Sequence, residues 1–174
     1  MNYVNEPGFR SFVCLDFETT GFSAASDRVT EIGAVKVIDG EICQTFSSLV
    51  NPGRPIPRQV VELTGITDAM VLEQPGIQEL LPVFLGFLGS LPLVAHNAAF
   101  DCKFLERDLH TAGREIDNPV ADTLKLARKI CPGLQSYSLS ALTEHFAIPL
   151  NHAHRAWCDA EATARLYLTL QTIG

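Results

Sequence analysis

Short apolar runs at the start of the chain predict strands. Residues 12–17 are almost wholly apolar, which is typical of a strand covered on both faces of a sheet. Residues 30–38 alternate β-branched and small residues, Asp39-Gly40 is a hairpin turn signal, and residues 42–50 have the pattern of a returning strand. We therefore predict three antiparallel strands, with the first of them central in the sheet.

Helical spacing dominates after the Pro-rich segment 51–57, which we expect to be a loop. Two short helical patterns follow, and then a longer one over about 77–88. Residues 91–95 form a further apolar run, which predicts a buried strand. Asn97 is a favoured residue type for capping the next helix, which should end before Gly113.

The last third of the chain is predicted to be mostly helical. A brief strand near Val120 leads to Asp122, another favoured cap residue. Helices are then expected at about 123–130, 139–146 and 156–170. With the short helices merged, the order of elements is β-β-β-α-β-α-β-α-α-α.

No repeat, low-complexity tract or long linker divides the chain. Its 174 residues and 47% hydrophobic share are enough for one sizeable core. We predict an α/β fold in a single domain over residues 11–174, with a five-stranded mixed sheet flanked by helices, after a loose leader at 1–10. The leader lacks a basic stretch followed by an apolar run of membrane-spanning length, and the five cysteines are scattered, so a cytoplasmic location is expected.

The net charge of −7 argues by itself against a nucleic-acid binder, because binding through phosphate neutralisation usually requires a basic face. Six of the thirteen basic residues, however, lie between Lys103 and Lys129. Bound divalent cations would also add positive charge at one point. The local charge of a site could therefore differ from the net charge.

Asp16 and Glu18 are the first candidates for a metal site. They are two residues apart at the end of an extended segment, so both carboxylates should lie on one face. A divalent cation would relieve the repulsion between them, and oxygen-only ligands suit Mg²⁺ or Mn²⁺. The alternative is an ordinary solvated strand end.

Three later residues can join this pair. Asp101 should lie in the first turns of the helix after strand 91–95, near the carboxyl end of that strand, where sites gather in open α/β sheets. His154 and Asp159 are five apart, so we place His154 in a loop and Asp159 in the first turn of the last helix. A mobile imidazole there could take a proton from water. The alternatives are an acid favoured by the helix dipole and a surface histidine.

Three segments together resemble the motifs of the DnaQ-like, or DEDDh, exonucleases, a family typified by the epsilon proofreading subunit of bacterial DNA polymerase III. They are Asp16-Phe17-Glu18-Thr19-Thr20-Gly21, His96-Asn97-Ala98-Ala99-Phe100-Asp101 and His154-Arg155-Ala156-Trp157-Cys158-Asp159. The resemblance covers nearly the whole chain, and it implies a ribonuclease H-like fold.

The resemblance also implies the roles of the site residues. Asp16, Glu18, Asp101 and Asp159 become catalytic ligands of two divalent metal ions, Mg²⁺ or Mn²⁺, and His154 becomes the general base. His152 is a nearby rival whose spacing to Asp159 fits the family less well.

Substrate contacts are expected at five further positions. The segment 63–66 resembles the family region near the terminal nucleotide, although the epsilon type often has His at the position of its Thr. Residues directly after the acidic pair could contact the 3′-terminal sugar, and a plain turn is the alternative. The predicted substrate-binding residues are Thr19, Thr20, Gly21, Thr64 and Asn97.

The sequence thus predicts a 3′–5′ exonuclease that releases nucleoside monophosphates from single-stranded or frayed DNA ends, in proofreading or repair. Its partners would be a nucleic-acid 3′ end, with DNA favoured over RNA, and a DNA polymerase or repair complex. No membrane and no nucleotide cofactor are expected. The alternatives are an RNA-trimming exoribonuclease of the oligoribonuclease type and a noncatalytic module that docks to a polymerase.

Overall fold

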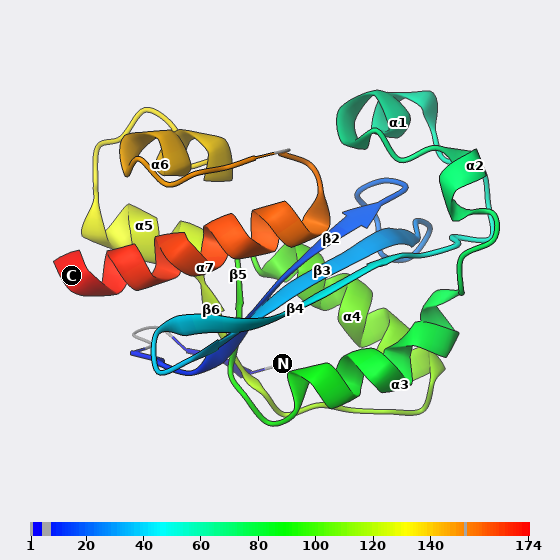
Figure 1. Cartoon of the computed structure of the whole chain (residues 1–174), viewed down its shortest axis with the longest axis horizontal. Helices are drawn as coiled ribbons and strands as arrows, with labels where there is room; N and C mark the ends of the chain where they lie inside the picture. The colour runs from blue at the N-terminus through cyan, green and yellow to red at the C-terminus, as the bar shows by residue number, and fades with distance from the viewer. Residues whose placement is uncertain (1, 5–7, 152) are drawn as a thin grey trace.

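The computed structural model describes residues 2–4, 8–151 and 153–174 of the chain, and within them a six-stranded sheet lies between two layers of helices (Figure 1). The strand order is β1-β6-β5-β2-β3-β4. The strands are β1 (Asn2–Tyr3), β2 (Phe12–Thr19), β3 (Val29–Ile38), β4 (Glu41–Leu49), β5 (Leu93–Ala95) and β6 (Pro119–Asp122).

The sheet is mixed, as the sequence predicts. Strand β3 pairs antiparallel with β2 and β4, whereas β5 is parallel to β2 and β6, and β1 is parallel to β6. The short strand β1 was not expected, because two residues carry no readable alternation. It forms because the free edge of β6 offers backbone partners: the Val4 N–H donates to the Val120 carbonyl at 2.9 Å. Residues 1 and 5–7 of the predicted leader lie outside the described residues.

Helices cover both faces of the sheet, and two short ones lie beyond the end at which the β2 arrow points (Figure 1). These two are α1 (Arg58–Thr64) and α2 (Asp68–Val71), and the others are α3 (Ile77–Leu88), α4 (Ala99–Thr111), α5 (Thr123–Ile130), α6 (Leu139–His145) and α7 (Ala156–Ile173). Helix α7 runs along one face with α5 and α6 beside it, and α3 and α4 lie on the other side (Figure 1). Among the described residues, no helix is both long and apolar enough to cross a bilayer.

Strand β2 is the centre of the fold because it buries both faces. Its odd-numbered residues, such as Val13 and Phe17, pack in the cluster that contains Phe84 of α3 and Phe104 of α4. Its even-numbered residues Phe12 and Cys14 pack beneath α7 with Tyr167. The period of two then places Asp16 and Glu18 on the α7 face, further along the same row.

Helix α7 approaches β3 closely at Gly33, which pairs with Asp16 of β2. A Cβ atom at this position would lie 2.0 Å from the Ala156 carbonyl carbon and 2.1 Å from the Trp157 nitrogen. Only a glycine leaves room for this contact. The first turn of α7 is thereby held directly over the acidic end of β2.

Of the two predicted helix caps, one is confirmed and one is wrong. The Asp122 Oδ1 atom accepts from the Leu124 N–H at 2.9 Å, which caps α5. Helix α4 instead has Ala98 as its cap residue, with no side-chain hydrogen bond. Asn97 adopts a left-handed φ of 59° just before it, since the chain turns sharply there between β5 and α4.

Candidate active site

A cleft of about 320 Å³ lies where β2 ends, between the starts of α4 and α7 and the helix α1. Nine of the ten residues predicted for the site line this cleft, and Thr20 does not. The predicted residues that line it are Asp16, Glu18, Thr19, Gly21, Thr64, Asn97, Asp101, His154 and Asp159. Three motifs that are far apart in sequence are therefore brought to one place.

Asp16 and Glu18 reach the cleft because β2 extends past its apolar run. Pairing with β3 continues through Asp16 opposite Gly33 and Glu18 opposite Glu31. Both side chains are half-buried. The strand therefore holds two carboxylates on one face, at the cleft that α7 overhangs.

Asp101 approaches the same strand from the start of α4. It is 2% exposed, and its Oδ1 atom accepts a hydrogen bond from the Phe17 N–H at 2.9 Å. Strand β5 ends at Ala95, so among the described strands none pairs with this edge of β2 at the level of Phe17. Asp101 satisfies the backbone donor that the short strand leaves open.

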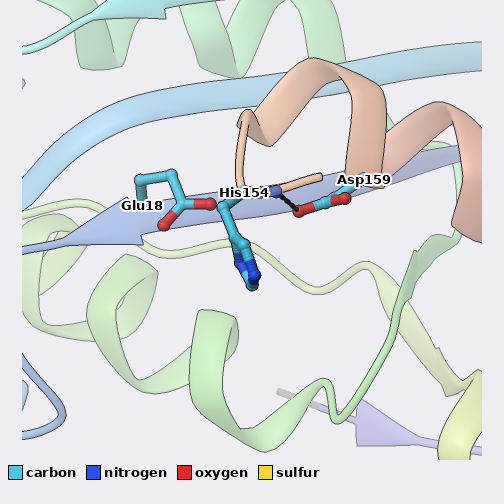
Figure 2. A group of neighbouring side chains, drawn as sticks. All are labelled: Glu18, His154 and Asp159. Atoms are coloured by element: carbon cyan, nitrogen blue, oxygen red, sulfur yellow. Dashed lines mark hydrogen bonds between the residues drawn. The ribbon is translucent and has the colours of Figure 1, made fainter. Parts of the chain in front are cut away.

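His154 and Asp159 lie where the sequence places them: His154 in the loop before α7, and Asp159 in the first turn. The His154 N–H donates to Asp159 Oδ2 at 3.0 Å, which supports a left-handed φ of 66° at His154 (Figure 2). The rival His152 lies outside the described residues. Figure 2 shows the Glu18, His154 and Asp159 side chains grouped together, and one ligand atom from each lies within 4.8 Å of the others.

The carboxylates are arranged unfavourably for a protein without bound cations. Burial raises the pKa of Asp16 well above its ordinary value, and repulsion by Asp101 and Glu18 raises it further. Burial, followed by repulsion from Asp159, raises the pKa of Glu18 to about 8. Burial also raises the pKa of Asp101, to about 7, and that of Asp159. The ionised form of each carboxylate is therefore less favourable in the fold than in water, because burial outweighs the nearby positive charge.

These residues fit a divalent cation site. The donors are mainly carboxylate oxygens, which hard cations prefer. The Asp159 Oδ1 atom is buried and has no hydrogen-bond partner within the described part of the chain, whereas its Oδ2 atom is engaged by His154. A buried charged oxygen without a partner is costly, and a cation would compensate it.

The raised carboxyl pKa values predict that, without divalent ions, the protein is less stable in mild alkali than in mild acid. The pKa of Glu18 rises on folding from 4.5 to about 8, so its stabilising contribution is complete below about pH 4.5 and is lost as the pH rises through about 8. In EDTA, the melting temperature should be lower at about pH 8.5 than at about pH 5.5. Mn²⁺ should raise it more at the higher pH.

The Glu18→Gln variant is the control for this prediction, since it removes one titrating carboxyl without changing its shape. Its melting temperature should depend less steeply on pH than that of the wild type. Equal pH dependence of the two proteins would show that Glu18 is not held in an unfavourable ionised state.

The hydroxyl groups of the predicted substrate-binding residues serve local structure. Thr19 Oγ1 donates to the Gly21 carbonyl at 2.6 Å, and Thr64 Oγ1 donates to the Val60 carbonyl at 2.9 Å. The Thr20 side chain is buried away from the cleft. Its hydroxyl accepts from the Arg28 N–H at 3.0 Å, because the chain turns back toward β3 there.

Sequence reasoning missed the apolar wall of the cleft. Val60, Leu63, Phe22 and Phe100 line it with the polar residues. Phe22 is 84% exposed and Leu63 54% exposed, so both offer apolar surface at the cleft. The only sequence signal was that Phe22 directly follows the first motif.

Lys103 of α4 contacts two residues of this wall. Its ammonium group donates to the Phe22 carbonyl at 2.7 Å and lies 4.9 Å from the centroid of the Phe100 ring. In contrast, Trp157 is half-buried and lines a separate hollow with Arg165, so it is not a stacking surface of this cleft.

The fold and the site together define a class of protein: a mixed α/β sheet with an acidic cleft at the end of its central strand. The same fold is found in exonuclease I, with a TM-score of 0.81 at 20% identity over 95% of this chain and 41% of that one, a likeness that shows the ribonuclease H-like fold alone. A family model described as "Exonuclease" (RNase_T) matches residues 13–167. The chain belongs to this exonuclease family, which confirms the prediction from the three motifs.

Individual relatives agree with this assignment. The DNA polymerase III subunit epsilon of Aquifex aeolicus is 43% identical over 161 residues, which cover 92% of this chain and 80% of that protein. The PolC-type DNA polymerase III of Clostridium perfringens is 48% identical over 155 residues, but the chain spans only 11% of that polymerase. A structure of exonuclease X in complex with 5′ overhanging duplex DNA matches with a TM-score of 0.77 and 36% identity, over 92% of this chain and 91% of that one.

Proposed function

We propose that this chain is a divalent-metal-dependent 3′–5′ exonuclease that removes nucleotides from the 3′ ends of DNA. The observation that supports this most directly is the meeting of Asp16, Glu18, Asp101, Asp159 and His154 in one cleft of a chain of the exonuclease family. The noncatalytic docking module is disfavoured by the same observation, because a docking role needs none of these five residues.

The four carboxylates would hold two divalent ions, Mg²⁺ or Mn²⁺. When bound, such ions activate water and stabilise the negative charge that develops on the phosphate during hydrolysis. Exonuclease I has been solved in a zinc-ion-bound form with single-stranded DNA, which supports divalent-ion binding by this fold. The Oδ1 atom of Asp159, which has no hydrogen-bond partner among the described residues, supports an ion position in this chain itself.

His154 acts as the general base in this proposal. Its side chain is exposed at the cleft beside Glu18 and Asp159, where it can take the proton of the water that attacks the scissile phosphorus. The hydrogen bond from its backbone N–H to Asp159 holds the loop close to the carboxylates. Proton removal and phosphate binding would thus take place in the same cleft.

The apolar wall supports the proposed preference for an unpaired terminal nucleotide. Phe22 and Leu63 offer exposed apolar surface to a base, and stacking on an aromatic side chain tolerates any base sequence. A base paired within a duplex cannot make this contact. Single-stranded or frayed ends are therefore the proposed substrates.

DNA is favoured over RNA, and proofreading or repair is the proposed role. The relatives named above are DNA polymerase III proteins, and exonuclease X was solved with DNA. The names of these relatives also support a DNA polymerase or a repair complex as the proposed partner. An RNA-trimming enzyme would use the same carboxylates, so a direct comparison of the two substrates is needed.

Labelled oligonucleotides test the proposal. With Mn²⁺, a 5′-labelled DNA strand should shorten one nucleotide at a time, and a 3′ label should leave as a mononucleotide in the first step. EDTA should abolish both reactions. The proposed activity would be contradicted if the 5′ label left first, or if neither Mn²⁺ nor Mg²⁺ supported hydrolysis. Faster digestion of a matched RNA strand would contradict the DNA preference.

A further inference from the structure

Glu31 is a buried acidic residue that the site described above does not use. It lies on β3 directly opposite Glu18 of β2, and its exposure is 0%. Residues that face each other in an antiparallel pair project from the same side of the sheet. A charged group therefore lies fully buried beside an already acidic cleft.

Both oxygens of Glu31 are engaged by the segment that precedes and starts α7. Oε1 accepts from Arg155 Nη2 at 2.7 Å and from Nε at 3.1 Å. Oε2 accepts from the same Nε at 3.1 Å and from the Ala156 N–H at 2.9 Å. Because both oxygens have donors, Glu31 is not available as a further ligand for an ion.

The hydrogen bond from the Ala156 N–H to Glu31 caps the N-terminus of α7. The first N–H groups of a helix have no partner within the helix, and in the described part of the chain the side chain of Arg155, the cap residue of α7, makes no capping hydrogen bond. Glu31 supplies the acceptor from a neighbouring strand, and its negative charge also suits the N-terminal end of the helix dipole. The start of α7 is thereby fixed to β3.

The residues fixed in this way lie between the two site residues of the third motif. His154 directly precedes Arg155, and Asp159 follows Ala156 within one turn. The His154 N–H in turn donates a hydrogen bond to Asp159 Oδ2 at 3.0 Å. Any shift of Arg155 and Ala156 relative to β3 would therefore move His154 and Asp159 relative to Glu18.

We propose that Glu31 and Arg155 form a positioning pair that sets His154 and Asp159 at the correct distance from the carboxylates of β2. The proposal rests on the proposed exonuclease function for its effect on turnover, but not for its effect on ion binding. Neither residue is among those that line the cleft. The pair acts through the geometry of the loop and the first turn of α7.

The Glu31→Gln variant tests the pair, because it keeps the shape of the side chain and removes its charge. Groups that orient metal ligands typically contribute about 10- to 100-fold to metal affinity or activity. We expect kcat to fall by about 10- to 100-fold with KM changed by less than about threefold, and the Mn²⁺ dissociation constant to rise by about tenfold. Calorimetric titration with Mn²⁺ alone, well below the melting temperature, gives the second value.

The matched control is Glu161→Gln. Glu161 pairs with Arg165 on the same helix through an Nη2–Oε1 contact of the same 2.7 Å, but that pair is partly exposed to solvent and lies away from the cleft. Its loss should leave kcat and Mn²⁺ affinity unchanged. If Glu31→Gln does not fold, Arg155→Lys replaces it, since lysine keeps the positive charge beside Glu31 but cannot make the forked contact.

The outcomes separate this inference from the proposed function. A folded Glu31→Gln or Arg155→Lys variant with wild-type kcat and wild-type Mn²⁺ affinity would overturn the positioning pair. A wild-type protein without any nuclease activity would overturn the proposed function instead. In that case the Mn²⁺ affinities of wild type and variant would still decide whether the pair positions Asp159.

Discussion

Replacing Asp16 by asparagine is expected to lower kcat by at least about 10³-fold while the chain remains folded. Asp16 projects from the central strand into the cleft, and its pKa is raised by burial and by repulsion from Asp101 and Glu18. Asparagine keeps the shape of the side chain but is a neutral, weaker ligand. The loss should be measured with a 5′-labelled oligonucleotide in saturating Mn²⁺.

The same substitution should stabilise the protein when divalent ions are absent. An ionised Asp16 is unfavourable in the metal-free fold, so its removal should raise the melting temperature in EDTA, with the larger increase at alkaline pH. Loss of activity together with a gain of stability distinguishes a ligand from a structural residue. Asp117→Asn, at an exposed site, is the control and should change neither property. An Asp16→Asn enzyme within about tenfold of wild-type activity would remove this residue from the mechanism.

Replacing His154 by alanine is expected to lower kcat by about 10²- to 10⁴-fold, the usual range for the loss of a general base. His154 holds Asp159 through its backbone N–H, which alanine retains. The carboxylates should therefore stay in place, and the Mn²⁺ dissociation constant should change by less than about threefold. Single-turnover kinetics and calorimetric titration measure the two quantities.

These two measurements also separate the roles that the geometry allows for His154. Its ring is close enough to Glu18 and Asp159 to share an ion with them. If His154→Ala lost Mn²⁺ affinity in proportion to its activity, His154 would be a ligand and the general base would have to be sought elsewhere. His110→Ala, on the exposed surface of α4, should leave both values unchanged.

Much of the fold could be predicted from local pattern. The long elements β3, α3 and α7 begin within one residue of their predicted positions, because apolar periodicity over about ten residues leaves little choice. Short elements were harder to predict from the sequence. The two-residue strand β1 depends on a free sheet edge, and Asn97 was given a capping role that its left-handed backbone does not permit.

The candidate site could be predicted in its residue types but not in its surroundings. Asp16, Glu18, Asp101, His154 and Asp159 were recognisable because their motifs keep fixed spacings. The exposure of Phe22 and the burial of Thr20 could not be predicted from the sequence, since both follow from the path of the turn after β2. Glu31 also has no local signal, because it lies within a strand pattern and its partner Arg155 is 124 residues away.

The sequence by itself determined the kinds of secondary structure, the alternation that places Asp16 and Glu18 on one face, and membership of the exonuclease family. Only the tertiary structure decided that the other carboxylates meet this pair, that Asp159 has a buried oxygen without a partner among the described residues, and that Glu31 connects α7 to β3. The physical reason is the sequence separation of the residues that interact. Periodicity and turn chemistry act between near neighbours in the chain, whereas the site is built from segments brought together by the packing of α4 and α7 on the central strand.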